Sequence, residues 1–270
     1  MNGNMRSVSR LASVFVLLLA LMGPLAAQTV SPAGPFGFLL TTSFTDPTNQ
    51  GGAAILGVMR FDGTGKVSGP YTLEFGSGGT LPVTTITGGF SGTYSSNPDG
   101  TGTILINLDN GYALTLDMTI EDSGHGLQLI ATSCSCTGGI DLSVSVFGGA
   151  GMHAKKLASG SASALNGSYG GQFTFSPQPS RSNTVFSFDG AGNTTMSITF
   201  VGTGPNIISA AYTGTYIVNA NSTGTITLPA VPGQGQQTFV FVITNEGGPG
   251  LLLMQTNRLG DGVSFGTVRQ

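Results

Sequence analysis

The sequence of 270 residues predicts an all-β fold made of two tandem, small, antiparallel up-and-down β-barrels. The first observation is an internal repeat. FSGTYSSNPDGTGTILI at 90–106 aligns without a gap with YTGTYIVNANSTGTITL at 212–228, and eight of the 17 positions are identical. The second is a shared Phe-Asp-Gly-x-Gly segment, which begins at Phe61 and again at Phe188. The third is a series of short segments of alternating apolar and polar residues, separated by turns rich in Gly, Asn and Asp, which is typical of strands joined by hairpins.

The composition agrees with a folded chain. Apolar residues make up 39% of the sequence and the mean hydropathy is +0.23, although only 8% of the residues are charged. Such a chain is expected to fold, because disorder requires low hydrophobicity. The formal net charge is −3 and no basic stripe is present, which argues against nucleic acid as a partner.

The N-terminal residues have the organisation of a cleaved signal peptide, expected over 1–27. Arg6 and Arg10 precede an apolar run at 11–22, and a small-residue segment ends at Ala27. The apolar run is short for a membrane span, although a retained anchor helix is the alternative. We therefore expect a secreted protein, periplasmic or extracellular, with no stable membrane insertion.

The first barrel unit is expected over 34–148. Its Asp-Gly-Thr-Gly segment at 62–65 is a hairpin signal, and in 112–120 alternate residues from Tyr112 onward share one apolar face. Eight strands are expected in this unit, at 36–44, 53–61, 66–75, 83–94, 102–108, 112–120, 127–132 and 140–147.

A linker at 149–165 and a second barrel unit over 166–270 follow. The linker contains ASGSASA at 158–164, whose small residues predict a flexible connection. Eight strands are expected again, at 167–175, 184–188, 194–201, 208–218, 224–228, 237–244, 251–256 and 262–268.

Closed barrels are favoured over the alternative of two β-sandwiches. Closure removes exposed sheet edges, and the chain has neither long Greek-key crossovers nor a Cys–Trp–Cys core. Gly92 and Gly214 each lie between two aromatic residues of the same face, where a Gly often marks a sharp bend of a barrel strand.

Two segments of the second unit are apolar on both faces. They are FVFVI at 239–243 and LLLM at 251–254. A strand of this kind has both sides covered. The favoured interpretation is that their outer face packs against the first unit, and a partner or membrane surface is the alternative.

Cys134 and Cys136 are interpreted as a local disulfide. A strand separates residues i and i+2 by nearly the maximum span of a disulfide, so a bent loop is needed. Free thiols and a metal site are the alternatives, but a metal needs two more ligands, and His125 and His153 have no recognisable spacing. No metal or cofactor is therefore expected.

No pattern of catalytic residues is evident, and the protein is not expected to be an enzyme. Most acidic residues occupy turns, where Asp bonds the backbone, and the Asp-Gly-x-Gly turns are too isolated for a calcium repeat. Glu74 and Asp117 lie within strands, and we interpret both as solvent-facing.

The paired Phe-Asp-Gly-x-Gly, aromatic-x-Gly-Thr-Tyr and Thr-Gly-Thr-Ile segments resemble those of uncharacterised secreted bacterial proteins built of such units. The resemblance covers nearly all of 34–270 and implies no known activity. In outline each unit is also similar to lipocalin-like barrels, whose hallmark Trp is missing. Tyr169 and Phe36 are the nearest counterparts in the two units. This likeness implies ligand binding by analogy only.

The sequence thus predicts a secreted, non-enzymatic structural or surface-interaction module with an unknown macromolecular partner. The first alternative is a lipocalin-like carrier of a small apolar ligand. The second alternative is an outer-membrane barrel. Several expected strands are shorter than a membrane strand requires and a terminal aromatic residue is missing, so this alternative is disfavoured. If a ligand binds inside a barrel, the candidate interior residues are Phe188, Tyr216, Phe241 and Met254.

Overall fold

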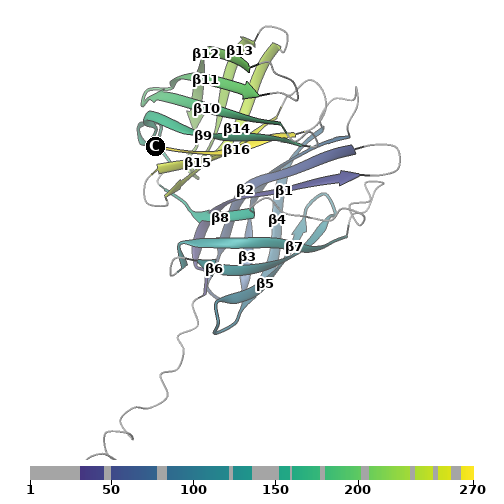
Figure 1. Ribbon diagram of the computed structural model, residues 1–270. Helices are drawn as coiled ribbons and strands as arrows, with labels where there is room; N and C mark the ends of the chain where they lie inside the picture. Colours follow the sequence, from purple (N-terminus) through teal and green to yellow (C-terminus); the bar gives the residue numbers. More distant parts are fainter. Residues whose placement is uncertain are drawn as a thin grey trace, which may run out of the picture.

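The computed structural model describes residues 31–45, 50–77, 84–121, 124–135, 152–158, 160–176, 180–201, 207–231, 235–245, 249–256 and 263–270. These residues form β-strands β1–β16 and a short 3-10 turn, η3 (Ala162–Ala164). The predicted signal peptide lies outside the described residues. The all-β prediction is confirmed (Figure 1).

The first eight strands form a closed antiparallel barrel in which consecutive strands are neighbours. The last strand completes the cylinder because it pairs with both the seventh strand and the first. The strands are β1 (Gly34–Thr45), β2 (Gln50–Phe61), β3 (Lys66–Ser77), β4 (Thr84–Ser96), β5 (Thr101–Leu108), β6 (Ala113–Glu121), β7 (Gly126–Ser135) and β8 (Met152–Lys156).

The next eight strands form a second closed barrel with the same order, in which the last strand pairs with the first. Circular ladders exclude two β-sandwiches, whose sheets would keep separate edges. Each barrel has the lipocalin-like outline that the resemblance implied. The strands are β9 (Asn166–Ser176), β10 (Ser180–Asp189), β11 (Asn193–Val201), β12 (Ile207–Val218), β13 (Thr223–Val231), β14 (Gly235–Asn245), β15 (Pro249–Gln255) and β16 (Val263–Arg269).

The strand that closes the first barrel differs from the expected one. β8 lies at Met152–Lys156, inside the stretch expected to be linker, whereas 140–147 lies outside the described residues. β8 pairs with only the first half of β1 and of β7. The segment MHAKK has little apolar alternation, so its strand conformation depends on the two neighbours that it joins.

The described part of the predicted linker is also held in place. Ser222 Oγ donates a hydrogen bond to the carbonyl of Ala158 at 2.5 Å, and the Ala158 N–H donates to the Ile243 carbonyl at 3.3 Å. Here the connection makes hydrogen bonds to the wall of the second barrel. Local composition could not reveal these contacts, because Ser222 and Ile243 are distant in the sequence.

The sequence repeat is reproduced in the hydrogen bonds of the Asp-Gly-x-Gly turns. Asp62 Oδ1 accepts hydrogen bonds from the N–H groups of Thr64 and Lys66 at 2.7 and 2.9 Å. Asp189 Oδ1 accepts the equivalent two bonds at 2.8 and 2.9 Å. The carboxylates therefore stabilise turns, as the sequence predicts.

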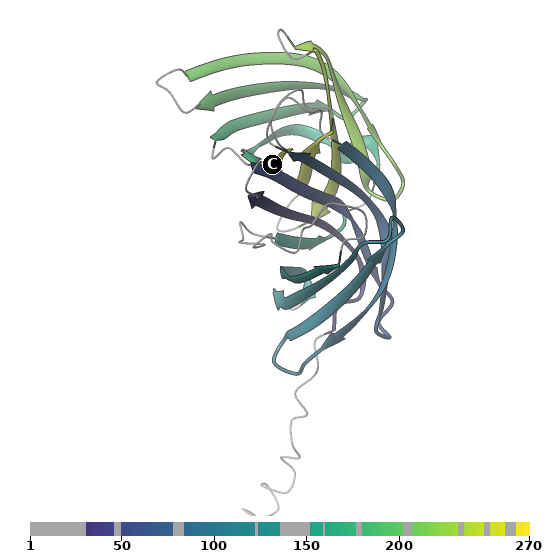
Figure 2. The same ribbon diagram turned by 90° about the vertical axis from the view of Figure 1, so that its right-hand side faces the viewer.

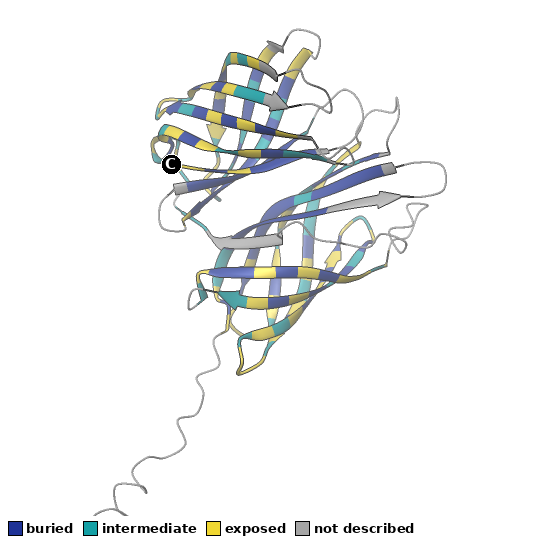
Figure 3. Cartoon of the chain, viewed as in Figure 1, coloured by how far each residue is buried: buried dark blue, intermediate teal, exposed yellow. Residues whose placement is uncertain are grey.

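Each barrel encloses its own apolar core. Along β5 the residues Ile104, Ile106 and Leu108 are buried, and the residues between them are exposed. Figure 3 shows this alternation of buried and exposed residues in both barrels. A pleated strand directs successive side chains to opposite faces, so alternate residues fill the cylinder.

A third apolar cluster, the inter-barrel interface, joins the outer faces of the two barrels. It confirms that the doubly apolar segments of the second unit pack on the first (Figures 1 and 2). β2 contributes through AAILGVM at 53–59, which is also apolar on both faces and is mostly buried in Figure 3. The buried members are Leu39, Ala54, Leu56, Val58, Val242, Leu252, Met254 and Phe265.

Candidate functional site

The interior of the second barrel contains three of the four candidate ligand-binding residues. Phe188, Tyr216 and Phe241 all belong to its buried core. The Phe188 ring packs edge-on against Tyr216, with ring centroids 5.0 Å apart, and against Tyr169 at 5.3 Å. These edge-to-face contacts stabilise the core.

Met254 lies elsewhere, and its predicted interior position is wrong. It belongs to the inter-barrel interface, whereas its neighbour Leu253 belongs to the core of the second barrel. Every residue from 251 to 254 is apolar, so the alternation that identifies an inward face is missing from the sequence. The tertiary contact alone decides which residues point outward.

The linker covers the interior of the second barrel at the end where Tyr216 lies. The Tyr216 hydroxyl is 3.0 Å from the carbonyl of Ala162 and 3.1 Å from that of Leu165. Burial is the main cause that raises the pKa of Tyr216 above its ordinary range, so the phenol remains a neutral donor. Tyr94 makes the equivalent bond in the first barrel, to the carbonyl of Pro32 at 3.2 Å.

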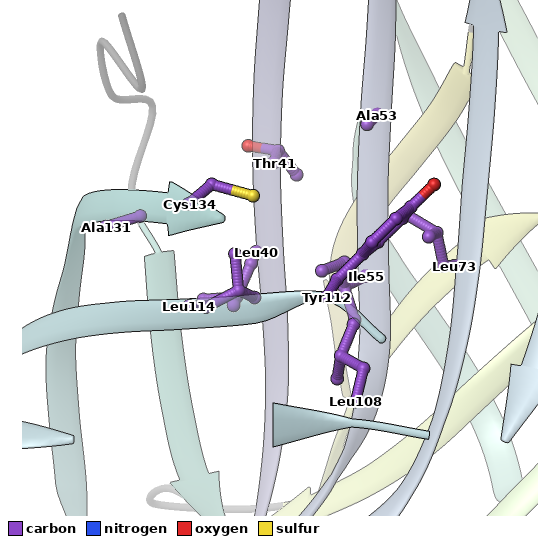
Figure 4. A pocket seen from close by; sticks show the side chains of 10 residues that line it. All are labelled: Leu40, Thr41, Ala53, Ile55, Leu73, Leu108, Tyr112, Leu114, Ala131 and Cys134. Carbon is purple, nitrogen blue, oxygen red and sulfur yellow. The ribbon is translucent and has the colours of Figure 1, made fainter. Parts of the chain in front are cut away.

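A small apolar cavity of about 30 Å³ lies inside the first barrel. Figure 4 shows ten side chains around it, with Leu40 and Leu114 close to Cys134. Such a volume has room for about two water molecules, whereas small-molecule pockets are roughly 300 Å³ or larger. The sequence did not point to this cavity, because it depends on the fit between strands.

Cys134 borders this cavity and takes part in a disulfide. Cys136, the partner that the sequence predicts, lies outside the described residues. Among the described residues, no group of three or more His, Cys, Asp and Glu side chains is arranged to hold a metal ion.

The outer face of β9, β10 and β11 carries an open groove of about 380 Å³. Gln172 Nε2 donates to Asn183 Oδ1 at 3.4 Å, and Thr199 and Ser209 pair their hydroxyls at 3.3 Å. No charged residue lines the groove. Its lining includes Gly170, Gln172, Asn183, Val185, Ser197 and Thr199.

The turn carboxylates are engaged with their own hairpins. The Thr64 hydroxyl and nearby N–H groups hold the pKa of Asp62 at about 2, and hydrogen bonds from Asn193 lower that of Asp189. Asp117 is exposed, as predicted. A carboxylate that accepts hydrogen bonds from backbone donors is a poor general base, so Asp62 and Asp189 have structural roles.

Glu74 is the exception, and its predicted exposure is wrong. Its side chain is 0% exposed. Glu74 on β3 pairs with Ala54 on β2, so its side chain lies on the same outer face as Ala54, which belongs to the inter-barrel interface. Burial raises the pKa of Glu74 to about 8, and Oε2 has no hydrogen-bond partner. The sequence contained a signal that Glu74 is buried. The neighbouring strand β2 is apolar on both faces, which predicts that its outer face is covered.

Thr85 connects Glu74 to the second barrel. Its Oγ1 is in hydrogen-bond contact with Glu74 Oε1 and lies 2.9 Å from the carbonyl oxygen of Thr256. The chain of atoms therefore runs from β3, through β4, to the residue that follows β15. Polar groups at this position join the two barrels directly.

No protein-family model matches the chain, and no curated protein matches it. Among the described residues, no helix is long and apolar enough to cross a membrane.

Proposed function

We propose that the protein is a secreted, non-enzymatic surface-interaction module. The observation that supports this function is the contrast between the two kinds of space in the described residues. The apolar cavity inside the first barrel has a volume of about 30 Å³, whereas the open groove on the outer face of the second barrel has a volume of about 380 Å³. Space for a partner is therefore available on the outer wall of the second barrel.

The chemistry of the groove favours a neutral, hydroxyl-rich polymer as the partner. Its polar lining consists of uncharged amides and hydroxyls, which both donate and accept hydrogen bonds. Val185 is 42% exposed and adds an apolar surface. A strongly charged ligand would find no opposite charge in this lining.

Binding of an insoluble neutral glucan to the full mature chain tests the proposal. Gly170→Lys places a side chain in the groove, and its Cβ would meet no atom within 4 Å. Arg269 pairs with this position across β16, so thermal unfolding must show that the added like charge leaves the fold intact. We expect at least a tenfold loss of binding. Thr103→Lys adds the same charge at an exposed site on β5 and should leave binding unchanged. Equal binding by wild type and Gly170→Lys would contradict the groove assignment.

A carrier of a small apolar ligand is the second candidate. The cavity beside Cys134 has the apolar lining that such a ligand needs, but its volume of about 30 Å³ would have to expand to hold one. Denaturing the purified protein and analysing released molecules by mass spectrometry separates the two functions. Under the surface-interaction proposal, we expect no stoichiometric apolar compound. Release of such a compound would indicate that the protein binds a ligand inside a barrel.

A further inference from the structure

The contact between Glu74, Thr85 and Thr256 specifies where the protons lie. A Thr hydroxyl has a single hydrogen, and the Thr256 carbonyl oxygen can only accept. If Thr85 donates to Thr256 at 2.9 Å, its contact with Glu74 Oε1 needs a hydrogen from the carboxyl group. Both contacts are satisfied together only when Glu74 is protonated.

We propose that Glu74 makes the inter-barrel interface sensitive to pH. The neutral carboxyl group completes the hydrogen-bonded chain to Thr256, and ionisation of that group weakens the contact between the barrels. The proton leaves from Oε1 by way of Thr85, which contacts Oε1 and is exposed to solvent, whereas Oε2 is covered. When Glu74 has lost its proton, the Thr85 hydroxyl donates its hydrogen to the carboxylate, and the Thr256 carbonyl loses this donor.

The surroundings of Glu74 disfavour its charged form. Oε2 is buried without a hydrogen-bond partner, and the adjacent cluster on β1, β2 and β14–β16 is apolar. A buried carboxylate needs charge partners or water, and each missing partner is expensive in free energy. Water reaches Oε2 only if the surfaces that cover it separate, so ionisation and loosening are coupled.

No positive charge on the neighbouring strands offsets this effect. β1, β4, β14 and β15 contain no charged residue. Lys66 lies eight residues from Glu74 along β3, which is roughly 26 Å in an extended strand. Arg60 on β2 pairs with Ser68, six residues or about 20 Å from Glu74.

The second barrel adds one charged residue on the strands that pack nearby. Arg269 lies four residues from the interface residue Phe265 along β16, about 13 Å away. Arg258 and Asp261 follow Thr256 but lie outside the described residues. Ionised Glu74 thus depends on solvent rather than on a cation of the described strands.

The test measures the distance between the barrels as a function of pH. Spin labels replace exposed Thr103 on β5 and exposed Thr213 on β12 of the full mature chain. Pulsed electron resonance gives the distance distribution from pH 6 to pH 10. For the wild type we expect a narrow distribution at pH 6 that broadens with a midpoint near pH 8.

Variants at position 74 distinguish the proposal from general alkaline unfolding. Glu74→Gln keeps a donor to Thr85 and cannot ionise, so its distribution should stay narrow up to pH 10. Glu74→Met is a second non-ionising variant of similar length for the case in which Glu74→Gln fails to fold. Asp117→Asn removes an exposed carboxylate and should broaden like the wild type.

Two results would overturn the proposal. One is a wild-type distribution that stays narrow throughout the titration. The other is broadening of a folded Glu74→Gln or Glu74→Met variant at the same pH as the wild type. Glucan binding at pH 6 is measured in parallel, so failure of the groove proposal is distinguishable from failure of this one.

Discussion

Tyr94 and Tyr216 occupy equivalent places in the two barrels, and each hydroxyl bonds the backbone that leads into its own barrel. Tyr94 donates to the Pro32 carbonyl at 3.2 Å, and Tyr216 lies near the carbonyls of Ala162 and Leu165 at 3.0 and 3.1 Å. Their N–H groups also make matching bonds to Gly65 and Gly192, both at 2.8 Å. The Tyr of the repeated hairpin thus holds the segment that leads into each barrel across one end of it.

Removing the Tyr216 hydroxyl should destabilise the second barrel. Tyr216→Phe leaves the carbonyls of Ala162 and Leu165 without this donor, and we expect a loss of about 1–2 kcal/mol in the free energy of unfolding. Urea denaturation measures the change. Tyr212→Phe is the control, because Tyr212 makes no hydrogen bond to the described residues through its hydroxyl. An equal loss of unfolding free energy in both variants would contradict the role of the Tyr216 hydroxyl in holding the linker over the barrel.

Adding a methyl group at Gly92 or Gly214 should destabilise the protein strongly. An added Cβ would lie 1.9 Å from the Leu105 carbonyl oxygen or 2.2 Å from that of Thr227, so the paired strands must separate. We expect each Ala variant to lose about 2 kcal/mol or more, as in other overpacked sites. Gly170→Ala is the matched strand control, since its Cβ meets nothing within 4 Å. Thermal unfolding should show little change for that control.

Acid should weaken the first hairpin turn through Asp62. Its pKa is about 2 in the folded protein, below the ordinary 3.8, so the unfolded chain takes up its proton first as the pH falls. The stabilisation is present above the unfolded value and is lost as the pH falls through the folded one. Asp62→Asn should show a shallower acid unfolding profile than the wild type between pH 4 and pH 2. Parallel profiles would argue against this contribution.

Alkali should weaken the fold through Glu74, with the opposite sign. Its folded pKa of about 8 lies above the ordinary 4.5, so the folded protein retains a proton that the unfolded chain has lost. The stabilisation contributed by Glu74 is complete below pH 4.5 and is lost as the pH rises from 4.5 through 8, by at most about 1.4 kcal/mol per pH unit. Chemical denaturation of Glu74→Gln between pH 5 and pH 9 should lack this decline. A decline as steep as in the wild type would assign it to other groups.

The sequence by itself determined most of the strands, the turns and the duplication. The Asp-Gly-x-Gly hairpins and the Tyr-containing repeat follow from local chemistry, because turn residues bond the backbone nearby and alternation marks an inward face. These signals also predicted that 239–243 and 251–254 would be covered on both sides. Alternation placed Phe188 and Tyr216 correctly inside the second barrel. Phe241 is also inside, but its segment is apolar on both faces, so the sequence alone did not fix its direction.

The tertiary structure alone decided the features that depend on distant neighbours. β8 is a strand because β1 and β7 leave a position between them, and Met254 points outward because the first barrel covers it. Glu74 lies in a strand whose local sequence predicts solvent exposure, and it is buried because β16 and the residue after β15 lie beside β3 and β4. Burial and the donor–acceptor balance of a carboxyl group are properties of its three-dimensional surroundings, and no local pattern in the chain encodes them.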